Sequence, residues 1–325
     1  MRWRMILLLV SILLVVSVWI VYGYSTVLQQ AFIRLLCSGN MGVKPQDYDA
    51  VLAAIDTLDT DTSYESRFDN GTLDVYAAKS GVPLPLIVYA HGGYYVGGDK
   101  RDFAYYCQSL AARGYVVANI NYQLAPEGRY PTQVLQVNEA IRFLLSRAEA
   151  YGIDPARVFI GGDSAGAHLS AQMGLYYTNP DFRARICGEP AIAPEQLRGV
   201  ILHCGYYNID TLRATRFPLI ADSVWMMTGE KRYEGTEAAK SMNTVAWITP
   251  AYPPVFIDCG DRDPFLSQAR EMIAALREQG VGVTSYLPTT GKFPLVHEFQ
   301  LHLNLSEARE ALERLAGFLG EKGER

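Results

Sequence analysis

Short apolar runs alternate with helix-like segments over most of this chain. Runs rich in β-branched and aromatic residues, each bounded by glycine or polar residues, predict strands at 73–77, 84–90, 115–122, 157–161, 199–204, 254–259 and 283–287. Amphipathic spacing between them predicts helices at 103–113, 131–151, 165–172, 266–279 and 305–319. This alternation predicts an α/β fold with a mostly parallel central sheet and helices on both faces.

The longest apolar run lies at the start of the chain, from Met5 to Tyr24, and follows Arg2 and Arg4. About 20 such residues form a helix of ~30 Å, which can cross a bilayer core. A cleavable signal peptide has a shorter core and a small-residue cleavage site, which this run lacks. We expect residues 1–24 to be a transmembrane anchor. The alternatives are a signal peptide that is cleaved before secretion and a buried helix. The two arginines predict a cytoplasmic N-terminus and place the remaining chain outside the cytoplasm.

Two segments depart from the strand–helix alternation. Residues 25–67 show helix-like spacing but no strand pattern, which predicts N-terminal cap helices over the active-site face or a linker between the domain and the membrane. The domain itself is expected over 68–325. Within it, residues 206–248 separate two strands and contain two tryptophans and a methionine pair, which predicts an inserted cap.

Charge and cysteine content limit the possible partners. The net charge is −5 with mixed signs and no long basic run, so we expect no nucleic-acid partner. The five cysteines show no Cys-x-x-Cys or Cys/His metal spacing, so neither a metal nor a cofactor is expected. Cys204 and Cys259 end apolar strands and are expected to be buried; one disulfide is possible, but the pattern does not require it.

A glycine-rich motif, Gly-Asp-Ser-Ala-Gly at 162–166, directly follows the strand predicted at 157–161. Its Gly-x-Ser-x-Gly pattern is typical of a sharp strand-to-helix turn that exposes a serine hydroxyl. Glycines at positions 162 and 166 would let the strand and the helix pack closely. Because the pattern also occurs by chance, it predicts Ser164 as a nucleophile only together with the motif described next.

The second motif, His91-Gly92-Gly93-Tyr94, follows the strand predicted at 84–90. Its glycines leave backbone N–H groups free to stabilise a developing alkoxide. We therefore expect an oxyanion hole formed by Gly92, Gly93 and Ala165. Tyr94 and Tyr95 are expected to line the substrate pocket and to narrow it. His91 is expected to hold the loop through a hydrogen bond.

A serine nucleophile requires an imidazole base, and in this fold type the histidine comes last in the chain. His297 fits because it precedes the final helix in the loop after the last strand, and His302 is the alternative. His168 lies one helical turn after the serine and cannot easily face it. His203 lies within a strand and precedes the acid candidates.

The base requires a carboxylate, and two aspartates follow the strand predicted at 254–259. Asp263 precedes a proline, which keeps its backbone extended, so we expect it to be the acid. Asp261 is the alternative and could instead be a helix cap or a solvated turn residue.

These motifs resemble the hormone-sensitive-lipase-like branch of the α/β-hydrolases, which includes bacterial carboxylesterases and membrane-anchored arylacetamide deacetylases. The resemblance covers roughly 84–318 and includes Asn-Tyr-Gln-Leu-Ala-Pro-Glu at 121–127 and the triplets at 263–265 and 297–299. It implies an α/β-hydrolase fold with a small cap, and a triad of Ser164, Asp263 and His297. Tyr94 stands where many members have a third glycine. Phe265 and Ser267 stand where leucine and aspartate are usual in the acid motif.

The sequence therefore predicts a serine hydrolase that cleaves short-chain carboxylic esters through an acyl-enzyme. Its expected partners are a small-molecule ester and, through the N-terminal helix, a membrane. The same triad would serve an amidase, a formamidase or a peptidase. The alternative from another class is a hydrolase-fold binding protein that has no catalytic activity.

Overall fold

A single mixed sheet runs through the computed structural model, which describes residues 2–39, 42–289 and 293–323. In this part of the chain eight strands are arranged in the order β1-β2-β4-β3-β5-β6-β7-β8. Their bounds are β1 (Ile55–Ser63), β2 (Thr72–Ala78), β3 (Leu84–Ala90), β4 (Val116–Ile120), β5 (Ile153–Asp163), β6 (Leu197–His203), β7 (Val255–Asp258) and β8 (Val283–Tyr286).

The six strands from β4 to β8 in this order pair in parallel, whereas the β1–β2 and β2–β4 pairings at one edge are antiparallel. Val88 of β3 lies opposite Ala118 on one side and Ile160 on the other, and all three are buried. Continuous apolar runs form these strands because helices cover both faces of a parallel sheet. The predicted fold class is confirmed.

The expectation of no strand within residues 25–67 is wrong, because β1 occupies Ile55–Ser63 and pairs with β2. The strand consists mostly of exposed Asp and Thr residues, and of its side chains only Ile55 is buried. A strand at a sheet edge forms through backbone pairing and needs no apolar alternation, so pattern analysis does not detect it. The sheet therefore begins before residue 68.

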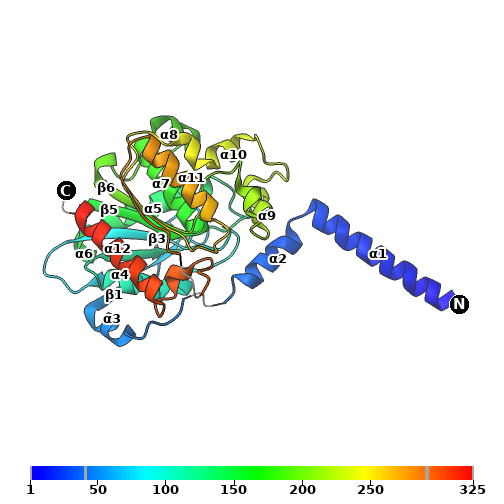
Figure 1. The fold of residues 1–325 in the computed structure, drawn as a ribbon, viewed down its shortest axis with the longest axis horizontal. Helices are drawn as coiled ribbons and strands as arrows, with labels where there is room; N and C mark the ends of the chain where they lie inside the picture. The colour runs from blue at the N-terminus through cyan, green and yellow to red at the C-terminus, as the bar shows by residue number, and fades with distance from the viewer. Residues whose placement is uncertain (1, 40–41, 290–292, 324–325) are drawn as a thin grey trace.

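Helices cover both faces of the sheet (Figure 1). On one face, α4 (Ala104–Ala111) and α12 (Ser306–Gly323) pack against a core that contains Ile87 and Phe159. The opposite face carries α5 (Thr132–Ser146), α7 (Ala165–Thr178), α8 (Pro180–Ile186) and α11 (Leu266–Glu278). The helix expected over 131–151 is divided at Arg147, where α5 ends and α6 (Ala148–Tyr151) begins.

The segment between β6 and β7 folds into short helices at the carboxyl end of the sheet. Their bounds are η3 (Leu212–Thr215), α9 (Ile220–Thr228), α10 (Glu237–Met242) and η4 (Thr244–Trp247). Val224, Met226 and Met227 are buried against the main core, so this segment is packed onto the domain.

The chain reaches this domain through three helices, α1 (Arg2–Tyr24), α2 (Val27–Leu36) and α3 (Tyr48–Ala54). Figure 1 shows α1 extending away from the domain, with α2 between them. Residues Trp3–Tyr24 have a mean hydropathy of 2.9, and none of this helix is buried. The helix is long and apolar enough to be a membrane anchor or a signal sequence.

A buried ion pair fixes the segment that follows the His91–Tyr94 loop. The Nζ atom of Lys100, whose side chain is 1% exposed, donates to carboxylates of Asp61 and Asp74, each at 2.6 Å. The Asp74 side chain is 6% exposed, whereas that of Asp61 is 75% exposed. The pair therefore joins this segment to the β1–β2 edge, and Asp74 depends on Lys100 for its charge compensation.

We predict that Lys100→Met lowers the free energy of unfolding by about 3 kcal/mol, because it leaves the buried Asp74 carboxylate without its cation. Urea unfolding of the full chain in detergent measures the change. Lys79→Met, which alters an exposed lysine on the same side of the sheet, should cost less than about 0.5 kcal/mol. Equal losses for the two variants would contradict the proposed role of the buried ion pair.

Candidate active site

Ser164 occupies a sharp turn between β5 and α7. Its φ is 51° and its ψ is −113°, a conformation that L-residues rarely adopt and that marks local strain. A Cβ at position 162 would lie 2.3 Å from the carbonyl oxygen of Ala90, and one at position 166 would lie 2.0 Å from it. Only glycine fits at these two positions, so the close packing predicted from the motif is confirmed.

A serine, a histidine and an aspartate meet at the carboxyl end of the sheet. His297 Nε2 lies 2.9 Å from Ser164 Oγ, and His297 Nδ1 lies 2.8 Å from Asp263 Oδ2. Asp263 follows β7 and accepts a further hydrogen bond from the backbone N–H of Phe265. Of the two histidine candidates, the structure therefore brings His297, and not His302, to the serine. Residues 290–292, in the loop that leads to His297, lie outside the described residues.

Asp261, the alternative acid, has a different role in the local structure. Its Oδ1 accepts a hydrogen bond from the backbone N–H of Leu295 at 2.9 Å. The bond ties the turn after β7 to the loop that carries His297. Asp261 thus helps to hold the histidine loop, while Asp263 contacts the imidazole.

Competing effects set the pKa of His297. Burial lowers it, but the hydrogen bond to Asp263 and the negative charges of Asp263 and Glu298 outweigh burial, so the pKa is raised above its usual value. Two other histidines near the site are buried and have no hydrogen bond to a carboxylate, and burial lowers the pKa of His91 and of His168 to about 4. These two imidazoles are therefore neutral at physiological pH.

The loop after β3 turns back on itself beside Ser164. Gly93 has a φ of 112°, and its carbonyl oxygen accepts hydrogen bonds from the N–H groups of Val96 and Gly97 at 3.0 and 2.9 Å. His91 stabilises the loop, because its Nδ1 donates to the carbonyl of Gly92 at 2.6 Å. Its ring also stacks on Tyr122 at a centroid distance of 4.4 Å. The hydrogen bond expected for His91 is confirmed.

A mostly apolar cavity of about 190 Å³ lies over Ser164. Its lining combines both motifs with residues from distant parts of the chain: Leu36, Cys37, Gly92, Gly93, Tyr94, Gly98, Phe103, Ser164, Phe217, His297 and Glu298. Ala165, the third expected oxyanion donor, is the first residue of α7 directly after the serine.

The two tyrosines expected in the pocket lie in different places. Tyr94 lines the cavity, and its ring packs on Phe217 at a centroid distance of 5.3 Å. Tyr95 does not line it: its side chain is buried in the core, and its hydroxyl lies 2.7 Å from His168 Nδ1. Successive residues of this loop point in different directions, so adjacency in sequence did not place both rings in the pocket.

Several residues that line the cavity were not among the predicted site residues. Leu36 and Cys37 come from the end of α2, and Phe217 comes from the segment between β6 and β7. Pattern analysis could not assign these three, because only chain folding brings them near Ser164. Glu298 directly follows His297, and its position in that motif was the only available clue.

Glu298 lies next to a second buried carboxyl group. Its Oε1 lies 3.7 Å from His297 Nε2, and its φ of 61° is strained for a residue with a side chain. A Cβ at position 92 would lie 3.1 Å from this oxygen and 2.2 Å from Asp163 Oδ2, so the two carboxyl groups flank Gly92. Burial, followed by the charge of Glu298, raises the pKa of Asp163 well above its usual value. The shift favours the neutral, protonated form of Asp163, and a neutral carboxyl group can lie beside Glu298 at a lower electrostatic cost than a second carboxylate.

Metal binding at this centre is disfavoured by its donor set. Among the described residues, Cys204, Asp263 and His297 offer ligand atoms within 4.8 Å of one another. His297 and Asp263 already bond each other, and burial raises the pKa of the Cys204 thiol well above its usual value. A thiol that keeps its proton is a poor metal ligand, so the donor chemistry fits a proton-transfer site better.

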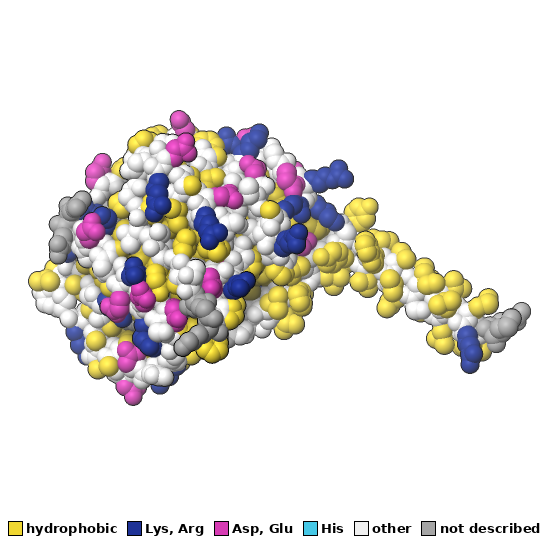
Figure 2. Space-filling view, in the orientation of Figure 1, with side chains coloured by type: hydrophobic (Ala, Val, Ile, Leu, Met, Phe, Trp, Pro, Cys, Tyr) yellow, Lys and Arg dark blue, Asp and Glu magenta, His cyan; other side chains and the backbone are white. Residues whose placement is uncertain are grey.

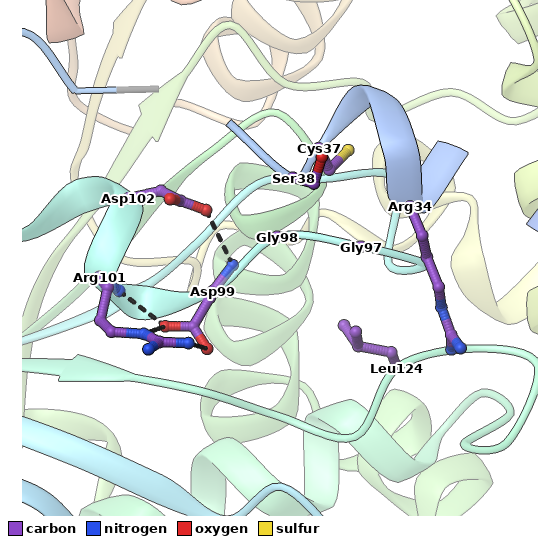
Figure 3. Close-up of a pocket in the computed structure, with 9 residues that line it drawn as sticks. All are labelled: Arg34, Cys37, Ser38, Gly97, Gly98, Asp99, Arg101, Asp102 and Leu124. Carbon is purple, nitrogen blue, oxygen red and sulfur yellow. Dashed lines mark hydrogen bonds and ion pairs between the residues drawn. The ribbon is translucent and has the colours of Figure 1, made fainter. Parts of the chain in front are cut away.

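A second, polar cavity of about 490 Å³ adjoins the first and shares Cys37 and Gly98 with it (Figure 3). Asp99 pairs with Arg101 along its wall. Burial raises the pKa of Asp102, on the same wall, to about 6. The apolar catalytic cavity thus has a charged neighbour, separated from it by the end of α2.

A strained serine, an imidazole and a carboxylate on a mostly parallel sheet define an α/β-hydrolase. The BD-FAE family model matches residues 73–276, and the chain belongs to that family. The resemblance to the hormone-sensitive-lipase-like carboxylesterase branch is thereby confirmed.

Relatives and solved structures agree with this class. The chain is similar to esterases LipC and LipQ of Mycobacterium tuberculosis, with 28% identity over 67% of the chain and 26% over 80%. These matches cover 55% and 62% of the relatives, so the chain spans less than two thirds of their length. Esterase B from Lactobacillus rhamnosis has a similar structure, with a TM-score of 0.75 at 21% identity over 85% of this chain and 90% of that one. This structural likeness shows the fold.

We predict that Glu298→Gln moves the protonation midpoint of His297 to lower pH. The glutamate charge helps to raise the pKa of His297, and the neutral amide removes that contribution. NMR titration of histidine-labelled protein, with the His297 signal assigned through His297→Gln, measures the midpoint. Glu313→Gln, which neutralises a surface glutamate paired with Arg113, should leave the midpoint in place. An unchanged midpoint in Glu298→Gln would contradict the assignment.

Proposed function

We propose that this protein is a serine carboxylesterase that hydrolyses short-chain esters through an acyl-enzyme. The observation that carries the proposal is the chain of contacts from Ser164 through His297 to Asp263, at 2.9 and 2.8 Å, in a strained turn beside a glycine loop. A hydroxyl is a weak nucleophile unless such a base accepts its proton. The esterase names of the relatives support the same reaction class.

In the proposed first half-reaction, Ser164 Oγ attacks the ester carbonyl carbon while its proton passes to His297 Nε2. Asp263 holds the other imidazole nitrogen and stabilises the imidazolium that forms. The carbonyl oxygen becomes an alkoxide, which the N–H groups of Gly93 and Ala165 stabilise. The N–H of Gly92, the third expected donor, is already bonded to the Asp163 carboxyl group and does not take part. The intermediate then collapses: the carbon–oxygen bond to the alcohol breaks, His297 returns its proton to the alcohol, and the acyl group stays on the serine.

Water completes the cycle. His297 takes a proton from a water molecule, whose oxygen attacks the acyl carbon and forms a second tetrahedral intermediate. The bond to Ser164 Oγ breaks, the proton returns to the serine, and the carboxylic acid leaves. His297 must be neutral at the start of each half-reaction, so activity should fall as the pH drops through its raised pKa.

The small size of the cavity favours a substrate whose acyl group, the part bound next to the serine, is short. Its volume is about 190 Å³, and the paired rings of Tyr94 and Phe217 close one side. We assign Phe217 to a cap formed by residues 206–248, so that the cap and the loop after β3 together limit acyl length.

We further propose that residues 1–24 anchor the protein in a membrane and that the catalytic domain lies outside the cytoplasm. Arg2 and Arg4 precede the apolar run, and positively charged flanks favour the cytoplasmic side. Trp19, Tyr22 and Tyr24 near the other end support an interfacial position there. Residues 25–67 then connect the anchor to the hydrolase domain and contribute β1 to its sheet.

We predict that Ser164→Ala lowers kcat/KM on p-nitrophenyl acetate and butyrate by at least about a thousandfold, because the triad acts as a unit. The full chain is assayed in detergent on esters from acetyl to dodecanoyl, and the wild-type rate should peak at acetyl or butyryl. Ser170→Ala, on the same helix but outside the cavity lining, should keep the wild-type rate. Wild-type activity in folded Ser164→Ala would refute the mechanism, and no ester turnover by folded wild-type protein would refute the esterase function.

We predict that Tyr94→Ala shifts the preference toward longer acyl chains, because it removes the ring that packs on Phe217. The ratio of kcat/KM for octanoyl to acetyl esters should rise by on the order of tenfold, as expected when several methylene groups gain apolar contact. Tyr94→Phe retains the ring and should keep the wild-type ratio. An unchanged ratio in Tyr94→Ala would show that this side chain does not limit acyl length.

A further inference from the structure

Helix α2 has two faces of opposite character. Its inward face carries Gln29 and Ile33, which are 1% and 0% exposed. The opposite face is apolar and open to solvent, and its large side chains are 40–69% exposed: Val27, Leu28, Phe32, Leu35 and Leu36. Surface helices usually turn their apolar stripe toward the core. Here the stripe faces outward, so its burial requires something outside the chain.

Polar contacts fix this orientation. Arg34 Nε donates to the carbonyl of Val96 at 3.0 Å, and Arg34 Nη2 pairs with Glu127 at 2.7 Å. Gln30 Nε2 also donates to Glu127, at 2.9 Å. In Figure 3 the Arg34 side chain reaches from the helix toward the loop that carries Leu124. The polar side of α2 is therefore bound to the domain, and the apolar side cannot turn inward without breaking these bonds.

The apolar face of α2 continues that of α1. Gln29 Nε2 donates to the carbonyl of Tyr22 at 2.8 Å, and Lys231 Nζ donates to that of Gly23 at 2.6 Å. These bonds tie the end of α1 to α2 and to the domain. Figure 2 shows hydrophobic side chains that extend from α1 over this part of the domain. If α1 ends at a membrane surface, α2 begins there.

Basic side chains gather where α1 ends. Arg213, Lys231 and Arg232 line a groove together with residues of α1, among them Trp19 and Tyr24. Cations beside an apolar helix and its aromatic residues match the headgroup region of a bilayer, where lipid phosphates carry negative charge. The charge pattern therefore favours a lipid surface as the partner of the exposed face.

The other end of α2 reaches the catalytic cavity. Leu36, the last residue of the helix, is 51% exposed on the apolar face and also lines the cavity over Ser164. An apolar surface thus runs along α2 from the end of α1 to the catalytic cavity. Water-soluble esters would not need such a surface, whereas esters dissolved in lipid would meet it first.

We propose that the outward face of α2 lies in the bilayer interface and that the catalytic cavity receives amphiphilic esters from the lipid phase. The proposal rests on the esterase function and the membrane anchor proposed above. Partial insertion of an apolar helix face is a known mode of interfacial binding, whose strength scales with the apolar area buried.

The first experiment measures contact with lipid. The full chain, carrying Cys187→Ser to remove the exposed thiol, receives a fluorophore at Leu35→Cys or, as a control, at Val82→Cys on the turn before β3. The proteins are reconstituted in phosphatidylcholine–phosphatidylglycerol vesicles with lipid-bound quenchers. We expect strong quenching at position 35 and little at position 82. Equal quenching at both positions would refute the proposed contact.

The second experiment separates this inference from the esterase function. Two acetate esters are compared, p-nitrophenyl acetate in water and a long-chain alkyl acetate held in the same vesicles. Phe32→Ser with Leu35→Ser should slow the vesicle-held ester on the order of tenfold, because less apolar area is buried. The rate on p-nitrophenyl acetate should stay unchanged, which also verifies folding, and Val82→Ser should alter neither rate.

The outcomes are distinguishable. If the double variant hydrolyses the vesicle-held ester as fast as the wild type, and both show normal rates on p-nitrophenyl acetate, delivery from the lipid phase is refuted. The esterase function is then unaffected. Absence of turnover of both esters by folded wild-type protein would refute the esterase function. The quenching experiment would then still decide whether α2 contacts lipid.

Discussion

The geometry of the site depends on one close backbone contact, between the end of β3 and the turn that carries Ser164. The carbonyl oxygen of Ala90 approaches positions 162 and 166 so closely that a Cβ at either would lie within 2.3 Å of it. Because the glycine loop starts at His91, this contact brings the nucleophile and the loop together. A larger residue at position 162 would push β5 away from β3, and one at position 166 would push α7 away from β3, so the serine would no longer face the oxyanion donors.

Around this contact, several ionisable groups are kept neutral by burial. Burial raises the pKa of Asp163 beside Glu298, which favours its neutral form, and burial lowers the pKa values of His91 and His168 to about 4. A neutral group can take part in a buried hydrogen-bond network at a much lower desolvation cost than a charged one. His297 is the exception, because the adjacent carboxylates favour its charged form. This contrast separates the groups that support the site from the one that transfers protons.

The N-terminal helices link the proposed active site to the proposed membrane anchor. Helix α2 is bound to the domain through its polar side, and its end forms part of the catalytic cavity. The same helix follows directly from the long apolar α1. This segment, expected from the sequence to cover the active-site face or to be a linker, therefore contributes to the pocket wall and presents an apolar surface outward. In the proposed arrangement, the position of the domain relative to the membrane and the route of the substrate depend on the same ten residues.

The sequence by itself determined the sheet, the strand–turn–helix around Ser164 and the candidates for base and acid, because each depends on local patterns: apolar runs, glycine spacing and the order of residues along the chain. Tertiary structure decided what depends on distance in space. It brought Asp263 rather than Asp261 to His297 and turned Tyr95 into the core. It also added β1 to the sheet through backbone pairing and assembled the pocket from segments that are distant in the sequence, since contacts between remote residues leave no periodic trace in a single sequence.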